Sequence, residues 1–285
     1  IAELPKVYDV ELESTLTQYE ANNQKLKDKN LAIQRTNREA YRLYNDLSET
    51  FKEYTETLKQ IDLSKFKLKK HQEEEKGLIG IIQLSDIHAN ELIFPVESNN
   101  NAYDFSIFSK RLKKLISEAI IYFRFKKVKN VHLFLTGDLI NSSRRVGEKL
   151  AQCTSLVRAS ILTTYLLQQA IIELSEYFNI TVSSVVGNES RILDDWESSD
   201  ILLSENWDYL IFNNLRLIFN NQPVTFTDSK NSSQVTVKIN EKYNALLLHG
   251  NQLRMPSPER DITKILQIYT YNGTKFDFPF VRTRS

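Results

Sequence analysis

The stretch GLIGIIQLSDIHAN, Gly77 to Asn90, decides the fold expected for this chain. It is a continuous apolar run, rich in isoleucine, that stops at Ser85-Asp86-Ile87-His88. Such a run is typical of a strand buried on both faces of a parallel sheet. Ligands of open α/β sheets bind just beyond the carboxyl ends of strands, where Asp86 and His88 can reach one metal ion. Taken alone, this Asp-x-His pair is a weak signal.

The same pattern of an apolar run that ends in polar residues beside glycine recurs three more times. Val131 to Thr136 runs into Gly137-Asp138, Ile180 to Val186 runs into Gly187-Asn188-Glu189, and Ala245 to Leu248 runs into His249-Gly250. The chain has only seven glycines, and three of them adjoin these polar residues. Glycine at a strand exit lets the backbone approach a ligand closely or turn through positive φ. The repetition therefore predicts one site built at the ends of several strands.

In this order the motifs, D-x-H, GD-x-x-N, GN-x-x and H-G, resemble those of the calcineurin-like metallophosphoesterase family over residues 78–280. The resemblance implies an α/β fold, a β-sandwich of mixed sheets flanked by helices. It implies that Asp86 and His88 bind one metal ion, that Asp138 bridges two, and that Asn188 and His249 bind the second. We expect two divalent ions, Mn²⁺ with Fe or Zn²⁺ as alternatives, that activate a water for attack on a phosphate ester.

Two features depart from the family pattern. The family has a histidine after the Gly-Asn of its third motif, which is taken to protonate the leaving oxygen, and this chain has Glu189 there. Two nearby cations favour the ionised form of a carboxyl group, which opposes that role for Glu189. The fifth motif, Gly-His-x-His, is missing, because the last of the four histidines is His249. Residues 271–278 (YNGTKFDF) are similar to the approach to that motif, so we expect it to follow the residues given, with the phosphoesterase domain incomplete at its C-terminal end.

Arginines after two of the motifs are candidates for holding the substrate phosphate, since a guanidinium group can donate two parallel hydrogen bonds to phosphate oxygens. Arg144 and Arg145 follow the second motif, where the family often has such an arginine, and Arg191 follows the third. An arginine pair at the start of a helix explains Arg144 and Arg145 equally well.

Residues 1–76 are expected to form an N-terminal helical arm, and residues 77–285 the phosphoesterase domain. From residue 8 to residue 76 the chain is rich in Glu, Lys, Asn and Gln and contains no Gly or Pro. One heptad position is apolar or aromatic in seven successive repeats from Tyr19 to Ile61, which is typical of a coiled coil. Asparagines seven residues apart on the other seam position favour a parallel homodimer through residues 16–61. A long helix that packs on its own domain or on a partner helix is the alternative.

The remaining patterns predict a helix over 104–127 that Asp104 caps, and further helices over 146–178, 205–219 and 258–268. They also predict a hairpin of two strands, 224–227 and 234–239, that leads into the strand before His249.

The composition bounds the possible partners and compartment. The net charge is +1 over 285 residues, so any contact with nucleic acid must come from local clusters. One such cluster is Phe123-Arg124-Phe125-Lys126-Lys127, which alone is a weak signal. A single cysteine excludes an intramolecular disulfide, and no apolar run approaches the ~20 residues that a bilayer span needs. We therefore expect a cytoplasmic protein without a membrane segment.

Within the family, the helical insert between the second and third motifs and the N-terminal arm are most similar to the phage and prophage DNA repair exonuclease branch. The first expectation is therefore a DNA nuclease with a dinuclear metal site. The near-zero net charge and Glu189 count against it. A phosphatase or small-molecule phosphodiesterase is one alternative. The other is a non-catalytic coiled-coil subunit with a degenerate phosphoesterase domain.

Overall fold

The computed structural model describes residues 22–31, 67–72, 77–93, 101–143, 151–192, 204–227, 233–251, 253, 257–271 and 275–281. The chain divides into two units, Ile1–Thr57 and Leu58–Ser285. In the first unit, residues 22–31 form a helix with exposed side chains, and the rest of the predicted coiled coil, residues 16–61, lies outside the described residues. The division falls before the expected boundary at residue 76, and residues 67–72 bond within the second unit. There Leu68 donates its backbone N–H to Gln222 Oε1 (2.9 Å), and His71 donates its N–H to Asn179 Oδ1 (2.9 Å).

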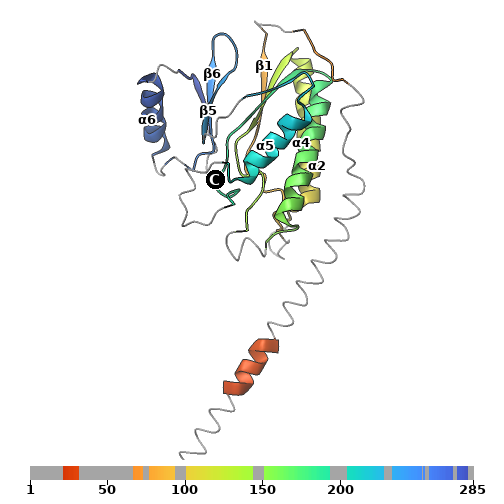
Figure 1. Cartoon of the computed structure of the whole chain (residues 1–285), viewed down its shortest axis with the longest axis vertical. Coiled ribbons are helices and arrows are strands. Elements are labelled where there is room, and N and C mark those ends of the chain that lie inside the picture. Colours follow the sequence, from red (N-terminus) through yellow and green to blue (C-terminus); the bar gives the residue numbers. More distant parts are fainter. Residues whose placement is uncertain are drawn as a thin grey trace, which may run out of the picture. The chain divides into compact units, whose positions relative to one another are not determined.

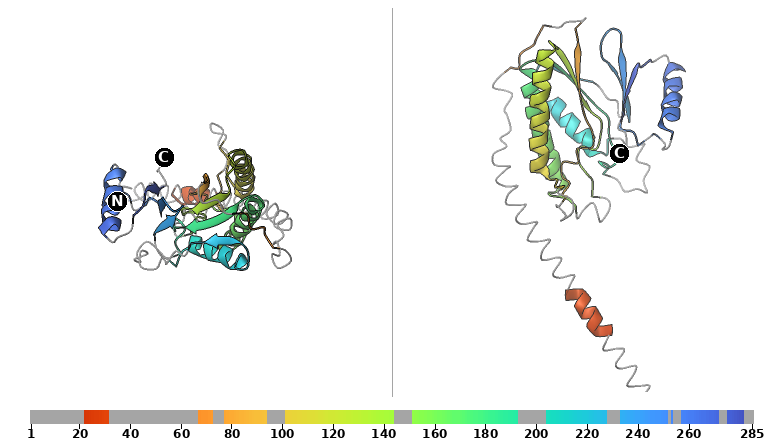
Figure 2. Two further views of the ribbon diagram at one scale, coloured as in Figure 1. Left: turned by 90° about the horizontal axis from the view of Figure 1, so that it is seen from above. Right: turned by 180° about the vertical axis from the view of Figure 1, so that it is seen from behind.

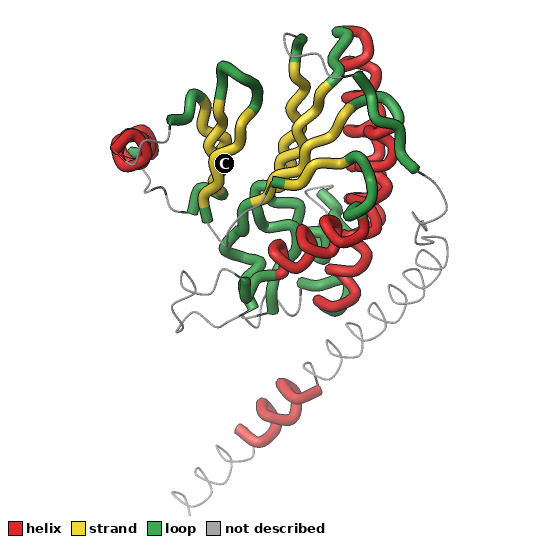
Figure 3. Tube along the Cα trace, turned by 45° about the horizontal axis from the view of Figure 1, so that its top comes forward, coloured by secondary structure: helices red, strands yellow, loops and turns green. Residues whose placement is uncertain are grey.

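The larger sheet of the second unit has four parallel strands in the order β1 (Ile79–Leu84), β2 (Asn130–Leu135), β3 (Asn179–Ser184) and β4 (Val224–Phe226) (Figure 1). The helices α2 (Phe105–Phe125), α4 (Leu156–Ser175) and α5 (Trp207–Ile218) return the chain between these strands. Asp104 accepts a hydrogen bond from the backbone of Ile107 and so caps α2, as predicted (2.8 Å). All three helices cover the same face of the larger sheet (Figure 3).

The smaller sheet is mixed, because β6 (Asn244–Leu248) pairs antiparallel with β5 (Gln234–Lys238) and parallel with β7 (Phe278–Phe280). Its outer face is covered by α6 (Pro258–Tyr271), whose Ile265 and Tyr269 pack on Leu246 and Leu248 (Figure 2). The predicted hairpin is wrong. Its first strand became β4, which joins β3 in the larger sheet, and its second became β5. Alternation of apolar residues predicts a strand but not the sheet it joins.

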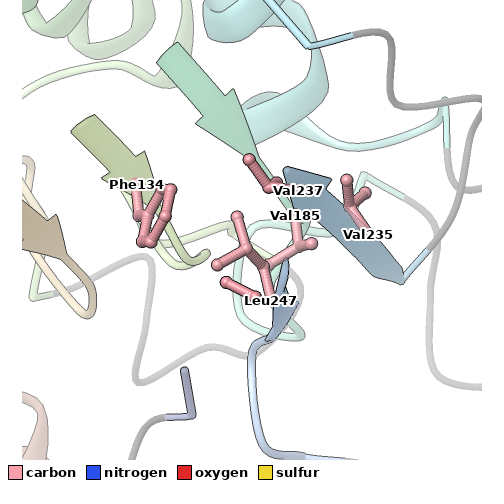
Figure 4. Packing of buried hydrophobic residues seen from close by; sticks show 6 residues of the cluster. Phe134, Val185, Val235, Val237 and Leu247 are labelled. Carbon is pink, nitrogen blue, oxygen red and sulfur yellow. The ribbon is translucent and has the colours of Figure 1, made fainter. Parts of the chain in front are cut away.

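The two sheets pack face to face through a buried apolar cluster that contains Phe134 of β2, Val185 beyond β3, Val235 and Val237 of β5, and Leu247 of β6 (Figure 4). Side chains of parallel strands buried on both faces explain the apolar runs in the sequence. The chain is thus a mixed α/β protein with one parallel and one mixed sheet. Among the described helices, none has the length and apolar character needed to cross a bilayer.

Candidate metal centre

The polar residues that end the apolar runs lie side by side at the carboxyl ends of β1, β2 and β6. Backbone hydrogen bonds continue the β1–β2 pairing beyond the strands: Asp86 N–H donates to Gly137 O (3.1 Å), and His88 N–H donates to Asp138 O (3.0 Å). The loops that carry the first two motifs are therefore held in register.

Four of the five predicted metal ligands converge in this region. One ligand atom each from Asp86, His88 and Asp138 lie within 4.8 Å of one another. His249, which follows β6 directly, places Nε2 2.9 Å from Oδ2 of Asp138. Asp138 and His249 are both 0% exposed. Three strands thus bring two carboxylates and two imidazoles into one largely buried cluster.

The hydrogen bond on the far side of the His249 ring shows what this contact requires. Nδ1 lies 2.7 Å from the carbonyl oxygen of Thr136, which can only accept, so Nδ1 must carry a proton. In a neutral ring Nε2 is then an acceptor that faces an acceptor oxygen of Asp138, and the two do not form an aligned hydrogen bond. Such a pair is stable only with a cation, either a proton on the ring or a metal ion beside both atoms. Two ligands that each lie about 2.1 Å from one octahedral ion are about 3 Å apart, which fits the observed distance.

His88 gives a second sign that a ligand belongs in the cluster. Its Nδ1 is buried and makes no hydrogen bond to the described residues, and its Nε2 lies 3.7 Å from Oδ1 of Asp86. Buried polar atoms of side chains are nearly always satisfied, so an orphan nitrogen needs an explanation. A metal ion bound by His88 and Asp86 supplies one.

The electrostatics of the cluster favour positive charge. Burial lowers the pKa of His88, but the contact with Asp86 and the charges of Asp138 and Glu91 outweigh burial and raise this pKa above its ordinary value. Burial likewise lowers the pKa of His249, and the contact with Asp138, the charge of Asp138 and the Thr136 carbonyl together raise it. An electrostatic field that raises the pKa of two buried imidazoles also favours the binding of divalent cations.

The backbone at the predicted ligands is strained. Among the described residues, four non-glycine residues have positive φ, and three of them are Asp86 (52°), His88 (44°) and Asp138 (55°). Each left-handed residue of this kind costs roughly 1 kcal/mol or more. Residues held in such conformations cluster at binding and catalytic sites, where the surrounding structure imposes them.

Two glycines allow the close approach of the loops. A Cβ on Gly187 would lie 2.1 Å from Oδ1 of Asp138, and a Cβ on Gly137 would lie 2.6 Å from Nδ1 of His249. Gly137 also has a φ of 93°. The third loop therefore packs directly on the second, as glycine at these strand exits led us to expect.

The fifth predicted ligand, Asn188, lies in this third loop. The backbone N–H of its neighbour Glu189 donates to Oδ1 of Asp138 (2.8 Å), and Nδ2 of Asn188 donates to Oε1 of Glu189 (2.5 Å). Arg191 follows in the same loop and pairs through its backbone with Asn206. Arg144 and Arg145 lie outside the described residues.

Asp208, in the first turn of α5, is a residue of the centre that the sequence analysis missed. It is 0% exposed, and its carboxylate accepts hydrogen bonds from the backbone N–H groups of Asp138, Leu139 and Gly187, each at 2.9 Å. The hydroxyl of Ser190 donates to it as well (2.8 Å). One side chain thus ties the second loop to the third.

The charge of Asp208 sits deep in the protein. Burial, followed by the charge of Asp138, raises the pKa of Asp208 to about 6, although its hydrogen bonds with Gly187, Leu139 and Ser190 act in the opposite direction. In the sequence Asp208 follows a helix N-cap, Asn206, and a local capping role accounts for an aspartate there. Nothing in the sequence indicates its bonds to loops 21 and 70 residues away.

Two more side chains fix the first loop. The hydroxyl of Tyr103 donates to the carbonyl of Ile87, between Asp86 and His88. Burial raises the pKa of Tyr103, so the phenol keeps the proton that it donates. Asn90 donates to the carbonyl of Asn141 (2.9 Å) and accepts from its N–H (2.7 Å). All three loops are therefore held by hydrogen bonds before any ligand is present.

No protein-family model, no curated protein and no solved structure matches the chain. The case for the centre therefore rests on its residues and their geometry.

Proposed function

We propose that the chain is a divalent-metal-dependent phosphodiester hydrolase of the calcineurin-like metallophosphoesterase type, and that its substrate is DNA. The observation that carries the proposal is the buried 2.9 Å contact between acceptor atoms of His249 and Asp138, next to Asp86 and His88. Motifs spread from residue 86 to residue 249 have no reason to meet in this way for packing alone, because buried charges are costly unless they are paired or bind metals.

The donor set fits the ions expected. Carboxylates and imidazoles together suit Mn²⁺, Fe or Zn²⁺ better than Ca²⁺, which takes oxygen ligands. Of these residues, Asp86 and His88 would hold one ion, Asn188 and His249 would hold the other, and Asp138 would serve as a ligand for both. Ions bound there supply Lewis-acid activation of a phosphate ester and of the attacking water.

The chain's own residues orient this chemistry. Thr136 fixes the ring of His249 so that Nε2 faces inward, and Asp208 holds the backbone of Asp138 against Gly187. We assign Glu189 to orienting the carboxamide of Asn188, since its carboxylate accepts that hydrogen bond. The leaving oxygen then takes its proton from water, and Arg191 is the described candidate for binding the phosphate.

The test uses a substrate whose leaving group needs no proton donor. Metal-loaded protein is expected to hydrolyse bis(p-nitrophenyl) phosphate with Mn²⁺ and to lose this activity in EDTA. Removal of a metal ligand by Asp138→Asn or His88→Ala should lower the rate at least about 100-fold.

The matched control is Asp104→Asn, which is none of the proposed ligands, keeps a side chain able to cap α2 and should leave the rate unchanged. Circular dichroism checks that all variants fold. A folded, metal-loaded protein that cleaves neither this substrate nor DNA would refute the proposal, as would full activity of Asp138→Asn.

A further inference from the structure

The amino ends of the parallel strands carry a surface of a different chemical kind. Six exposed cations lie in three segments there: Arg124, Lys126 and Lys127 at the end of α2, Lys129 before β2, and Lys67 and Lys69 in residues 67–72. The amino end of β1 is at the top of Figure 1. Three exposed aromatic side chains accompany the cations: Tyr122, Phe125 and Tyr177. We call these nine residues the basic edge.

Hydrogen bonds and ring contacts bring the segments of the basic edge together. His71 donates its N–H to the side chain of Asn179, and Asn179 donates its own N–H to the carbonyl of Lys129 (both 2.9 Å). The rings of Phe123 and Phe178 meet edge to face, with centroids 6.0 Å apart, and join the end of α2 to the start of β3. The segments that carry the cations therefore lie along one edge of the sheet, although they are up to 62 residues apart in sequence.

The aromatic side chains are exposed and already lie beside cations. Phe125 is 78% exposed at the end of α2. The guanidinium of Arg124 lies 4.7 Å from the ring centroid of Tyr177, and Nζ of Lys126 lies 5.7 Å from that of Tyr122 and 5.6 Å from that of Phe125. Basic groups interleaved with exposed rings are the elements that bind single-stranded nucleic acid, with cations along the phosphates and rings under the bases.

A purely structural role for these cations is a poor explanation. Basic residues in the last turn of a helix interact favourably with its dipole, which accounts for Arg124 and its neighbours. It does not account for Lys129, Lys67 and Lys69, nor for the exposed rings. Within the described part of the chain, none of the six cations forms an ion pair with a carboxylate.

The basic edge also has room for a ligand. A hollow of about 480 Å³ opens between Gly77, Leu78, Arg124, Lys127 and Tyr177. This volume is within the range of about 300–1,000 Å³ that small-molecule sites occupy, so a single nucleotide unit fits.

We infer that the basic edge binds single-stranded nucleic acid. The inference extends the proposed function, because it names the form of the substrate, yet binding at the basic edge needs no metal ion. A strand of six residues is about 20 Å long, so a nucleic-acid strand that reaches from the basic edge to the metal centre must cover at least about this distance.

The test is the binding of a fluorescein-labelled oligodeoxythymidylate of about 30 nucleotides, followed by anisotropy in EDTA at several salt concentrations. Arg124→Ala, Lys126→Ala and Lys129→Ala in one variant should make the slope of log K against log[salt] shallower by about 2, since each phosphate contact with a single strand contributes about 0.7. Phe125→Ala should weaken binding at least about five-fold and leave the slope unchanged, because it removes stacking and no charge.

Controls come from exposed residues elsewhere. Leu217→Ala removes another exposed apolar side chain at the end of a helix, and Arg260→Ala with Lys264→Ala removes two cations of α6. Both variants should bind the oligonucleotide as the unmodified protein does. Equal binding by the basic-edge variants and these controls would overturn the inference, as would binding only to phosphatidylserine vesicles and not to the oligonucleotide.

The two proposals fail separately. If bis(p-nitrophenyl) phosphate is not hydrolysed while the oligonucleotide binds as described, the inference about the basic edge is supported and the hydrolase proposal is refuted. If hydrolysis is normal and the oligonucleotide does not bind, only the basic edge falls.

Discussion

The two ends of the parallel sheet use opposite kinds of residue. At the carboxyl ends, acceptor groups of Asp138 and His249 are fully buried and face each other. At the amino ends, cations and aromatic rings are exposed to water. Burying two hydrogen-bond acceptors against each other costs folding free energy, whereas cations exposed to water cost almost none. Under the two proposals, the ligand of the carboxyl end enters the protein, whereas the ligand of the amino end lies on its surface.

Left-handed residues make the same distinction. Lys127 has a φ of 58°, close to the values at Asp86 and Asp138. At Lys127 it ends a helix, since the next N–H, of Val128, donates back to the carbonyl of Phe123 (2.9 Å). Glycine would serve there as well. At Asp86 and Asp138 the same conformation aims a carboxylate into the cluster, so the side chain itself is required.

The largest effect is expected from Asp208→Ala. This change leaves three buried N–H groups without their acceptor, at roughly 1–3 kcal/mol each, so we expect a loss of about 3–5 kcal/mol in the free energy of unfolding. It should also weaken Mn²⁺ binding about 10- to 100-fold, because the loops that carry Asp138 and Asn188 lose their common anchor. Urea unfolding and a metal titration measure the two quantities.

Asp104→Ala is the matched control, another aspartate at a helix start, and it should cost about 1 kcal/mol and leave Mn²⁺ affinity unchanged. If Asp208→Ala changes the free energy of unfolding and the Mn²⁺ affinity no more than this control does, Asp208 does not organise the loops at the carboxyl end of the sheet.

At the amino end of the sheet, we expect a smaller change in the free energy of unfolding, and one that stabilises the protein. Lys127→Gly should stabilise the protein by up to about 1 kcal/mol, because glycine adopts the left-handed conformation without the steric cost of a side chain. The midpoint of urea unfolding measures it. Asp138→Gly relieves the same backbone strain, yet it should abolish metal binding. A destabilised Lys127→Gly would mean that strain does not distinguish the two ends.

Much of the fold could be predicted, because period and capping are local signals. The four apolar runs are strands β1, β2, β3 and β6, and Asp104 caps α2 as its position indicated. The sheet assignment of residues 224–226 could not be predicted, since three residues carry too little pattern to distinguish a hairpin from a parallel neighbour of β3.

The sequence predicted that four of the five proposed ligands lie together, but it did not predict the residues that hold their loops in place. A polar residue beside or near a glycine recurs at the end of several strands, and this pattern predicted that Asp86, His88, Asp138 and His249 lie together, as they do. Asp208 and Tyr103 act through long-range hydrogen bonds to backbone groups, and a backbone donor leaves no mark in a sequence. Of the basic edge, only the cluster at the end of α2 is contiguous in the sequence. Lys67, Lys69 and Lys129 belong to other segments, which the fold brings to the same edge.

The most direct test of the central claim is calorimetric titration of the metal-free protein with Mn²⁺ at about pH 6 and about pH 8. The raised pKa values of His88 and His249 mean that protons compete with the metal at the lower pH. We predict saturable Mn²⁺ binding that releases protons and is tighter at the higher pH. We also predict that His249→Ala weakens this binding at least about ten-fold. Absence of binding at both pH values, or binding that His249→Ala leaves unchanged, would contradict the claim that these side chains form a metal centre.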